Sequence, residues 1–238
     1  MVRYFRVPIV LALVLAAAPL LAQGLDPRTP AGQLAACGGA ANWQAIGYMD
    51  FTVSIATPSG TEGPWNYRWD RRNNFLRMSG PGPGGAKLDM VLEIASRSGG
   101  GWSNGRQISG AALANAVNWT LQRFGEDVLW LTFPLEWGAA GVTVSPLPDV
   151  QGEGGAMVPA TKVMSRTGTW TVQLDPATGR ITKTVFARRG SGALDIRWED
   201  WKPFGGVYFA LKRTIQETQE VVTVAVNEVA AASPPGAF

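Results

Sequence analysis

Residues 169–214 read TWTVQLDPATGRITKTVFARRGSGALDIRWEDWKPFGGVYFALKRT, and this stretch predicts an antiparallel β-meander. Trp170, Val172 and Leu174 alternate with polar residues, which is the pattern of a strand with one buried face and one wet face. The alternation recurs at Leu194, Ile196, Trp198, Val207, Phe209 and Leu211. Residues typical of turns separate these strands at 175–179, 189–192 and 203–206. The stretch therefore favours a mainly β (α+β) fold.

Further strands are expected on both sides of the meander. Alternating apolar residues or turn signals mark 51–55, 65–69, 75–79, 87–95 and 220–227. Residues 142–163 are rich in Pro and Gly, so we expect a loop-rich segment with strand-like pieces at its ends. The glycine-rich pieces 79–85 and 98–105 are short enough to be turns.

Two segments predict helices. Residues 30–46 are rich in Ala, Gln and Leu and predict a short helix that Gly38 and Gly39 weaken. Residues 109–124 carry apolar side chains at helical spacing, with Ser109 placed as the N-cap and Gly125 as the terminator. The apolar run 128–133 that follows is typical of a strand or turn region covered on both sides.

The N-terminus predicts export. Residues 1–22 join Arg3 and Arg6 to an apolar run and small residues, the layout of a secretory signal peptide. The alternative is a membrane anchor, but the apolar run is shorter than the ~20 residues that span a bilayer. We expect no transmembrane span in the mature chain. Residues 23–232 fit one domain better than two small ones, and 233–238 should form a flexible C-terminal tail.

Charge and composition exclude several functions. Lys and Arg number 21 against 18 Asp and Glu, and two of the arginines lie in the signal peptide. The basic cluster at Arg68, Arg71, Arg72 and Arg77 is better explained as a solvated hairpin tip than as a nucleic-acid site. The chain has no His, so Ser-His-Asp and Cys-His catalysis is excluded, along with the commonest zinc ligand.

We therefore expect no enzyme, no catalytic residue, no metal site and no cofactor. No phosphate-binding loop is present either, because the glycines at 80–85 alternate with prolines and no helix follows them. Carboxylate catalysis is the remaining enzymatic alternative. It would need pairs such as Glu126 with Asp127 or Glu199 with Asp200, for which exposure to solvent is the default expectation.

Cys37 is the only cysteine, so an intramolecular disulfide is impossible. The sequence Leu34-Ala35-Ala36-Cys37 matches the pattern of bacterial lipoprotein processing, and lipidation would tether the protein to a membrane. Charged residues and prolines separate Cys37 from the apolar signal, however. The competing interpretation, a small apolar residue buried under the sheet, is preferred.

Large apolar side chains are plentiful at strand and helix positions that should face inward. Simple core packing explains them, but a half-open sheet lined in this way also suits an apolar chain, since each buried methylene contributes ~0.8 kcal/mol. The candidate cavity-lining residues are Trp65, Tyr67, Trp69, Met90, Leu92, Leu121, Trp130, Phe133, Trp170, Leu174, Trp198 and Phe209.

Five segments carry a resemblance to a known family. They read CGGAANWQAIGYMDF, NYRWDRRNNFLRM, VLWLTFPLEWG, QLDPATGRITKTVF and DIRWEDWKPFGGVYFALKRT. Together they cover most of the mature chain, which resembles the LolA/LolB-like periplasmic lipoprotein-localisation superfamily, in particular an uncharacterised branch described as outer-membrane lipoprotein-sorting-like. The resemblance implies an incomplete antiparallel β-barrel, or half-barrel, wrapped around one or more helices, with a hydrophobic cavity for acyl chains.

The expected function follows from these observations. The protein should be a periplasmic protein that binds a lipid, a lipoprotein acyl chain or another hydrophobic ligand between the concave sheet and a helix, without catalysis. Its expected partner is a lipid or an acylated protein, and possibly a further envelope protein. The alternative is a structural or protein-interaction module of the cell envelope with a filled core.

Overall fold

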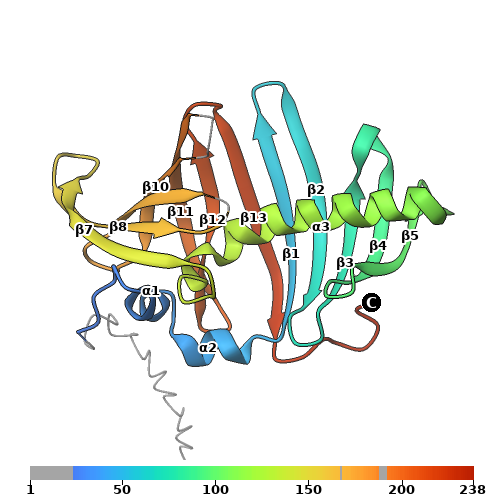
Figure 1. Ribbon diagram of the computed structural model, residues 1–238, viewed down its shortest axis with the longest axis horizontal. Coiled ribbons are helices and arrows are strands. Elements are labelled where there is room, and N and C mark those ends of the chain that lie inside the picture. Colours follow the sequence, from blue (N-terminus) through green and yellow to red (C-terminus); the bar gives the residue numbers. More distant parts are fainter. Residues whose placement is uncertain (1–23, 167, 188–191) are drawn as a thin grey trace, which may run out of the picture.

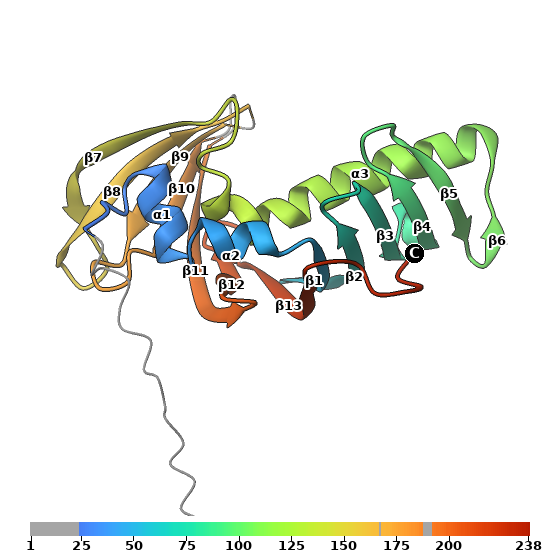
Figure 2. The ribbon, with the colours of Figure 1, turned by 90° about the horizontal axis from the view of Figure 1, so that it is seen from below.

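The computed structural model describes residues 24–166, 168–187 and 192–238. Thirteen strands of this described part form a single antiparallel sheet that stays open. Figures 1 and 2 show the sheet curving around one long helix, so the expected fold class, an incomplete barrel around a helix, is confirmed. The expected signal peptide and the turn at 189–191 lie outside the described residues.

The elements have the following bounds in chain order. The helices are α1 Pro30–Ala36, α2 Ala40–Ala45 and α3 Gly110–Thr132, with 3-10 turns η2 Pro83–Gly85 and η3 Phe133–Leu135. The first six strands are β1 Tyr48–Thr57, β2 Gly60–Asp70, β3 Phe75–Pro81, β4 Lys87–Glu93, β5 Ser98–Ser103 and β6 Arg106–Gln107. The other seven are β7 Thr143–Gln151, β8 Met157–Met164, β9 Thr169–Leu174, β10 Ile181–Ala187, β11 Ala193–Phe204, β12 Val207–Ile215 and β13 Glu220–Ala230.

The sheet consists of two meanders joined in the middle. Its strand order is β6-β5-β4-β3-β2-β1-β13-β12-β11-β10-β9-β8-β7, so nearly every strand pairs with its neighbour in sequence. The pairing of β1 with β13 is the exception and joins the two meanders. The chain passes from the edge strand β6 to the edge strand β7 through α3, which crosses one face of the sheet (Figure 1).

The meander expected at 169–214 is confirmed as β9 to β12. Trp170, Val172 and Leu174 are buried, while the residues between them are half-buried. The turn after β9 forms as the sequence predicts, because the Asp175 carboxylate accepts hydrogen bonds from Ala177 N at 2.8 Å and Thr178 Oγ1 at 3.0 Å. The alternation in β11 is interrupted at Asp200, which has a positive φ of 57° and no partner in the register with β12.

The long helix corrects two expectations. We expected a helix that ends at Gly125 and a strand or turn at 128–133, but α3 continues through both to Thr132. An exposed glycine inside a helix costs about 1 kcal/mol, and this cost is smaller than the gain from burying Phe124 and Leu131 on one face of the same helix. A six-residue apolar run also has too little periodicity to separate a buried helix from a strand.

Three other expectations need correction. Residues 98–105 form strand β5 and the turn into β6 rather than a turn alone. Residues 143–164 form the full hairpin β7 and β8, with a register shift between Leu147 and Val150. The expected helix at 30–46 is split into α1 and α2, because Gly38 has a φ of 110° and a Cβ there would meet the Gly206 carbonyl oxygen at 2.1 Å.

The turn between β2 and β3 carries two residues that hold neighbouring segments in place. Arg71 lies with its guanidinium carbon 3.4 Å from the ring centre of Trp43 and donates hydrogen bonds to the backbone oxygens of Trp43 and Ile46. Contrary to the expected solvated hairpin tip, this arginine therefore fastens the end of α2 to the sheet. Asp70 accepts a hydrogen bond at 2.5 Å from Ser233 Oγ of the C-terminal segment.

The C-terminal segment lies along the sheet near β1 and β3. Ala237 is buried, and the Phe238 ring lies 6.5 Å from that of Tyr48 and 6.1 Å from that of Phe75. The flexibility expected for 233–238 stays a prediction. Among the described residues, no helix combines the length and the apolar character needed to cross a membrane.

We expect the Asp70→Asn variant to be less stable than wild type at pH 7 by about 2 kcal/mol, because the buried carboxylate accepts hydrogen bonds from Arg72 N, Asn73 N and Ser233 Oγ. Burial acts to raise the pKa of Asp70, but these hydrogen bonds outweigh it and lower the pKa. The stabilisation is therefore present above the unfolded-state pKa of ~3.9 and is lost as the pH falls below it. Urea unfolding between pH 7 and pH 3 should show the difference between the two proteins shrinking.

A matched control for this variant is Asp200→Asn. Asp200 is exposed, forms an ion pair with Lys202 at 3.1 Å, and has a positive φ that asparagine tolerates. Its unfolding free energy should change by less than ~0.5 kcal/mol at either pH. An equal loss in both variants at pH 7 would contradict the role given to Asp70.

Candidate functional site

The candidate site is the contact between α3 and the face of the sheet that α3 covers. The twelve expected lining residues belong to three apolar clusters, and each cluster includes residues of α3 or η3. Nine of the twelve are buried, whereas Trp69, Leu121 and Trp130 are partly exposed. The structure therefore brings all twelve to the helix side of the sheet, where their side chains pack against one another.

Aromatic rings make up much of this contact. The Phe133 ring lies 4.8 Å from Trp170 and 5.8 Å from Trp198, and the Tyr67 ring lies 5.6 Å from Phe124. Such ring pairs add about 0.5–1.5 kcal/mol each to the gain from area burial. In this structure the space beneath the helix is filled by side chains.

A hydrogen bond from Tyr67 to Asp127 ties strand β2 to the middle of α3, where Asp127 also forms an ion pair with Arg123 of the same helix. Asp127 is 0% exposed and accepts hydrogen bonds from Tyr67 Oη at 2.5 Å, from Arg123 Nε at 2.9 Å and from Arg123 Nη2. Burial raises the pKa of Asp127, although Arg123 and Tyr67 partly offset this effect. Burial and the adjacent carboxylate also raise the pKa of Tyr67, so its hydroxyl stays a hydrogen-bond donor. The expectation of a solvent-exposed carboxylate is wrong for Asp127.

A second polar contact joins the C-terminal half of α3 to strand β12. Arg213 is 0% exposed, donates from Nη2 to the backbone oxygen of Trp130, and lies over the Trp198 ring at 4.7 Å. Its Nε and Nη1 atoms have no hydrogen-bond partner in the described part of the chain. Burial lowers the pKa of Arg213 to about 9, so the guanidinium is still charged at neutral pH.

Other buried polar atoms around this contact also lack partners among the described residues. They are Trp69 Nε1, Thr120 Oγ1, Trp137 Nε1 and Trp170 Nε1. An unsatisfied buried polar group costs about 1–3 kcal/mol, and native proteins contain few of them. Their concentration beside α3 and η3 makes this contact less favourable than an ordinary core of the same area.

The sequence contains a signal for both charged residues. Arg213 lies at the same alternation phase as Val207, Phe209 and Leu211, so its side chain must point inward with theirs. Asp127 lies on the buried stripe of α3 with Phe124 and Leu131. Neither Arg213 nor Asp127 is among the lining residues predicted from the sequence, although each lies at an inward position.

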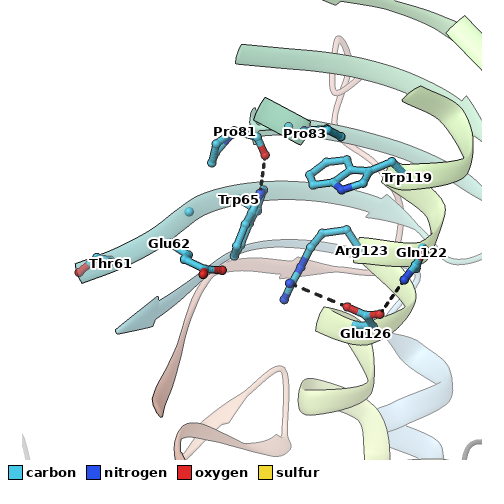
Figure 3. A pocket seen from close by; sticks show the side chains of 11 residues that line it. Thr61, Glu62, Trp65, Pro81, Pro83, Trp119, Gln122, Arg123 and Glu126 are labelled. Carbon is cyan, nitrogen blue, oxygen red and sulfur yellow. Dashed lines mark hydrogen bonds and ion pairs between the residues drawn. The ribbon is translucent and has the colours of Figure 1, made fainter. Parts of the chain in front are cut away.

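A cavity of about 440 Å³ opens at the flank of α3, beside the start of β2 and the loop of η2. Figure 3 shows Trp65 and Trp119 on two sides of it, with Arg123 between them and Glu62 and Glu126 at its margin. Thr61, Gly63, Pro81, Gly82, Pro83 and Gln122 complete the lining. Trp65 is the one expected lining residue that borders this cavity.

Cys37 is fully buried in the cluster beneath α2, and its Sγ accepts a hydrogen bond from Gln33 Nε2 at 3.4 Å. Burial raises the pKa of the thiol to about 12, which keeps it protonated. Within the described residues, no group of three His, Cys, Asp or Glu side chains gathers to form a metal site.

Comparison with known proteins gives matches in structure alone. No protein-family model and no curated protein matches the chain. A putative outer-membrane lipoprotein-sorting protein domain from Vibrio parahaemolyticus is 13% identical, with a TM-score of 0.42 over 89% of this chain and 91% of that one. A LolA superfamily protein from Nitrosomonas europaea is 9% identical, with a TM-score of 0.45 over 79% of this chain and 86% of that one.

A DUF1329 family protein from Desulfovibrio piger is 8% identical, with a TM-score of 0.42 over 80% of this chain and 88% of that one. These matches include the superfamily that the sequence resembles, in agreement with that expectation. At these values they concern the fold and carry no argument about what the chain binds.

Proposed function

We propose that this protein binds the apolar chain of a lipid or of an acylated protein between α3 and the sheet, in the envelope of a bacterial cell and without a catalytic step. The observation that carries the proposal is Arg213, a fully buried guanidinium beneath α3 with two nitrogen atoms that find no acceptor among the described residues. In the closed core this group makes one hydrogen bond, to the Trp130 carbonyl, and one contact with the Trp198 ring, which leaves most of its hydrogen-bonding capacity unused. A bound acyl chain with an ester or amide carbonyl supplies the acceptor that Arg213 lacks.

The helix is suited to separate from the sheet. It connects the two edge strands, and the polar contacts described above tie it to the sheet at Asp127 and at the Trp130 carbonyl. Arg97 of the turn after β4 also donates a hydrogen bond to Asn118, and Arg123 lies over the Trp65 ring. The remaining contact is mainly apolar, and an apolar contact can be replaced by an apolar chain at little net cost. Each methylene that enters contributes ~0.8 kcal/mol, so a long acyl chain gains on the order of 10 kcal/mol before entropy losses.

The test is to recover the ligand from protein that has been exported by a bacterium and purified without detergent. Native mass spectrometry should show an added mass that disappears after solvent extraction, and the extract should contain acyl chains. The stripped protein should then enhance the fluorescence of N-phenyl-1-naphthylamine, and added phospholipid should displace this apolar probe. Protein that carries no added mass and gives no probe signal would rule the proposal out.

The alternative is a non-binding structural or interaction module of the envelope. The tight packing of rings such as Phe133, Trp170 and Trp198 in the closed contact favours it. The same purification separates the two functions, because a module with a permanently filled core yields no lipid. It should instead give reproducible cross-links to a specific protein in intact cells.

A further inference from the structure

The cavity at the flank of α3 carries more negative than positive charge. Arg123 is the positively charged residue of its lining, and the buried Asp127 already neutralises it through two hydrogen bonds. Glu62 and Glu126 remain. Glu126 is 53% exposed, lies 3.9 Å from Arg123 and accepts a hydrogen bond from Gln122 Nε2 at 3.1 Å, while the Glu62 side chain has neither an ion pair nor a hydrogen bond to any described residue. The cavity therefore favours a cation.

Two tryptophan side chains line the cavity, and an indole ring attracts cations through its π system. The protein itself shows this at Trp65, because the guanidinium carbon of Arg123 lies 4.2 Å from the centre of that ring. The Trp119 side chain, on the opposite side in Figure 3, packs against two apolar clusters of the core but has no ring, cation or hydrogen-bond contact with another described side chain. The exposed part of Trp119 borders the cavity together with Glu62 and Glu126, so a ligand in the cavity would meet all three side chains.

We infer that this cavity binds the ammonium head of the amphiphile whose apolar chain lies beneath α3. The inference rests on the proposed function and adds the charge of the head group to it. Arg123 and Trp130 are seven residues apart, which is about 10 Å along a helix. One amphiphile therefore spans the distance from the cavity to the Arg213 side chain, with its carbonyl at Arg213 and its cation between Trp119 and the two glutamates.

Three probes with the same twelve-carbon chain test this inference: dodecyltrimethylammonium, dodecanoate and the uncharged dodecyl maltoside. Each is titrated below its micelle concentration, at low salt, and binding is followed by tryptophan fluorescence and calorimetry. We expect the cationic probe to bind about tenfold more tightly than the uncharged one, since cation–π and carboxylate contacts together supply about 1.4 kcal/mol. Raising the salt to about 1 M should reduce this preference through screening.

The decisive variant is the double substitution Glu62→Gln and Glu126→Gln. It should remove the tenfold preference for the cationic probe and leave the affinity for dodecyl maltoside within twofold of wild type. Trp119→Phe should lower the affinity for the cationic probe by roughly threefold and leave the affinity for the other two probes unchanged, because phenylalanine has the weaker cation–π interaction. Glu228→Gln removes one charge from an exposed position on β13 and should change nothing.

The uncharged probe separates failure of the inference from failure of the proposed function. If dodecyl maltoside binds and the cationic probe shows no advantage, or dodecanoate binds most tightly, the ammonium site is wrong while chain binding stands. If none of the three probes binds, both are overturned. A preference that persists in the double variant would also overturn the site, because the charge responsible would then lie elsewhere.

Discussion

Replacing Arg213 with methionine is expected to raise the free energy of unfolding by about 1–4 kcal/mol. A buried charge without a carboxylate partner loses its hydration and regains little, so an apolar side chain of similar volume is the more stable occupant. The same variant should bind apolar ligands more weakly for two reasons. It removes the Nε and Nη1 donors that would bind the carbonyl of the ligand, and it stabilises the closed contact between α3 and the sheet. Urea unfolding and displacement of N-phenyl-1-naphthylamine measure the two effects on one protein.

The matched control for Arg213→Met is Lys212→Met. Lys212 precedes Arg213 on β12 and points to the opposite side of the sheet. Its exposed side chain pairs with Glu199 at 3.2 Å. Its loss should change stability by less than ~0.5 kcal/mol and leave probe binding unchanged. Destabilisation by Arg213→Met would show that Arg213 stabilises the closed core, and the argument for a missing ligand acceptor would fail.

The second large effect is expected at Asp127. The Asp127→Ala variant leaves Arg123 without its main partner and the Tyr67 hydroxyl buried without an acceptor. Breaking a buried pair on one side typically costs 3–5 kcal/mol, and about 3 kcal/mol is expected here, because Arg123 retains some contact with solvent. Urea unfolding at pH 7 measures this loss.

Two further variants show whether the loss arises from the pair. Asp127→Asn keeps an oxygen that accepts from Tyr67, so it should lose clearly less stability than Asp127→Ala. Glu126→Ala, on the next residue of α3, should stay within ~0.5 kcal/mol of wild type because its side chain is largely exposed. Similar losses for Asp127→Ala and Glu126→Ala would mean that the buried pair adds little to the attachment of α3.

The sequence predicts the strands of this protein better than its long helix. The β9 to β12 meander is predictable because alternating apolar residues mark its strands and turn residues separate them, as at Leu174, Asp175 and Gly179. The length of α3 is not, since Gly125 looks like a terminator until the packing of the residues beyond it is known. The burial of residues beyond Gly125 against the sheet determines where α3 ends, and this burial cannot be recognised from the neighbouring sequence.

The candidate site is predictable only in part. Periodicity brings residues such as Trp65 and Trp198 to the correct face of the sheet, because alternation fixes the side to which a strand residue points. It does not say whether these side chains contact a ligand or each other. The cavity beside α3 could not be predicted from the sequence. Its lining includes Glu62 on β2 and Trp119 on α3, and only the three-dimensional fold brings these segments together.

The pairing of the first strand with the last has a consequence for how the chain acquires its structure. Tyr48 of β1 pairs with Ala230 of β13, so the central pair of strands cannot form until almost the whole chain is present. Contacts between residues so distant in sequence slow folding, because the loop between them must be ordered first. A partly synthesised chain that lacks residues 220–230 can form at most two separate half-sheets, in which β1 and β12 each present an open edge where β13 would pair.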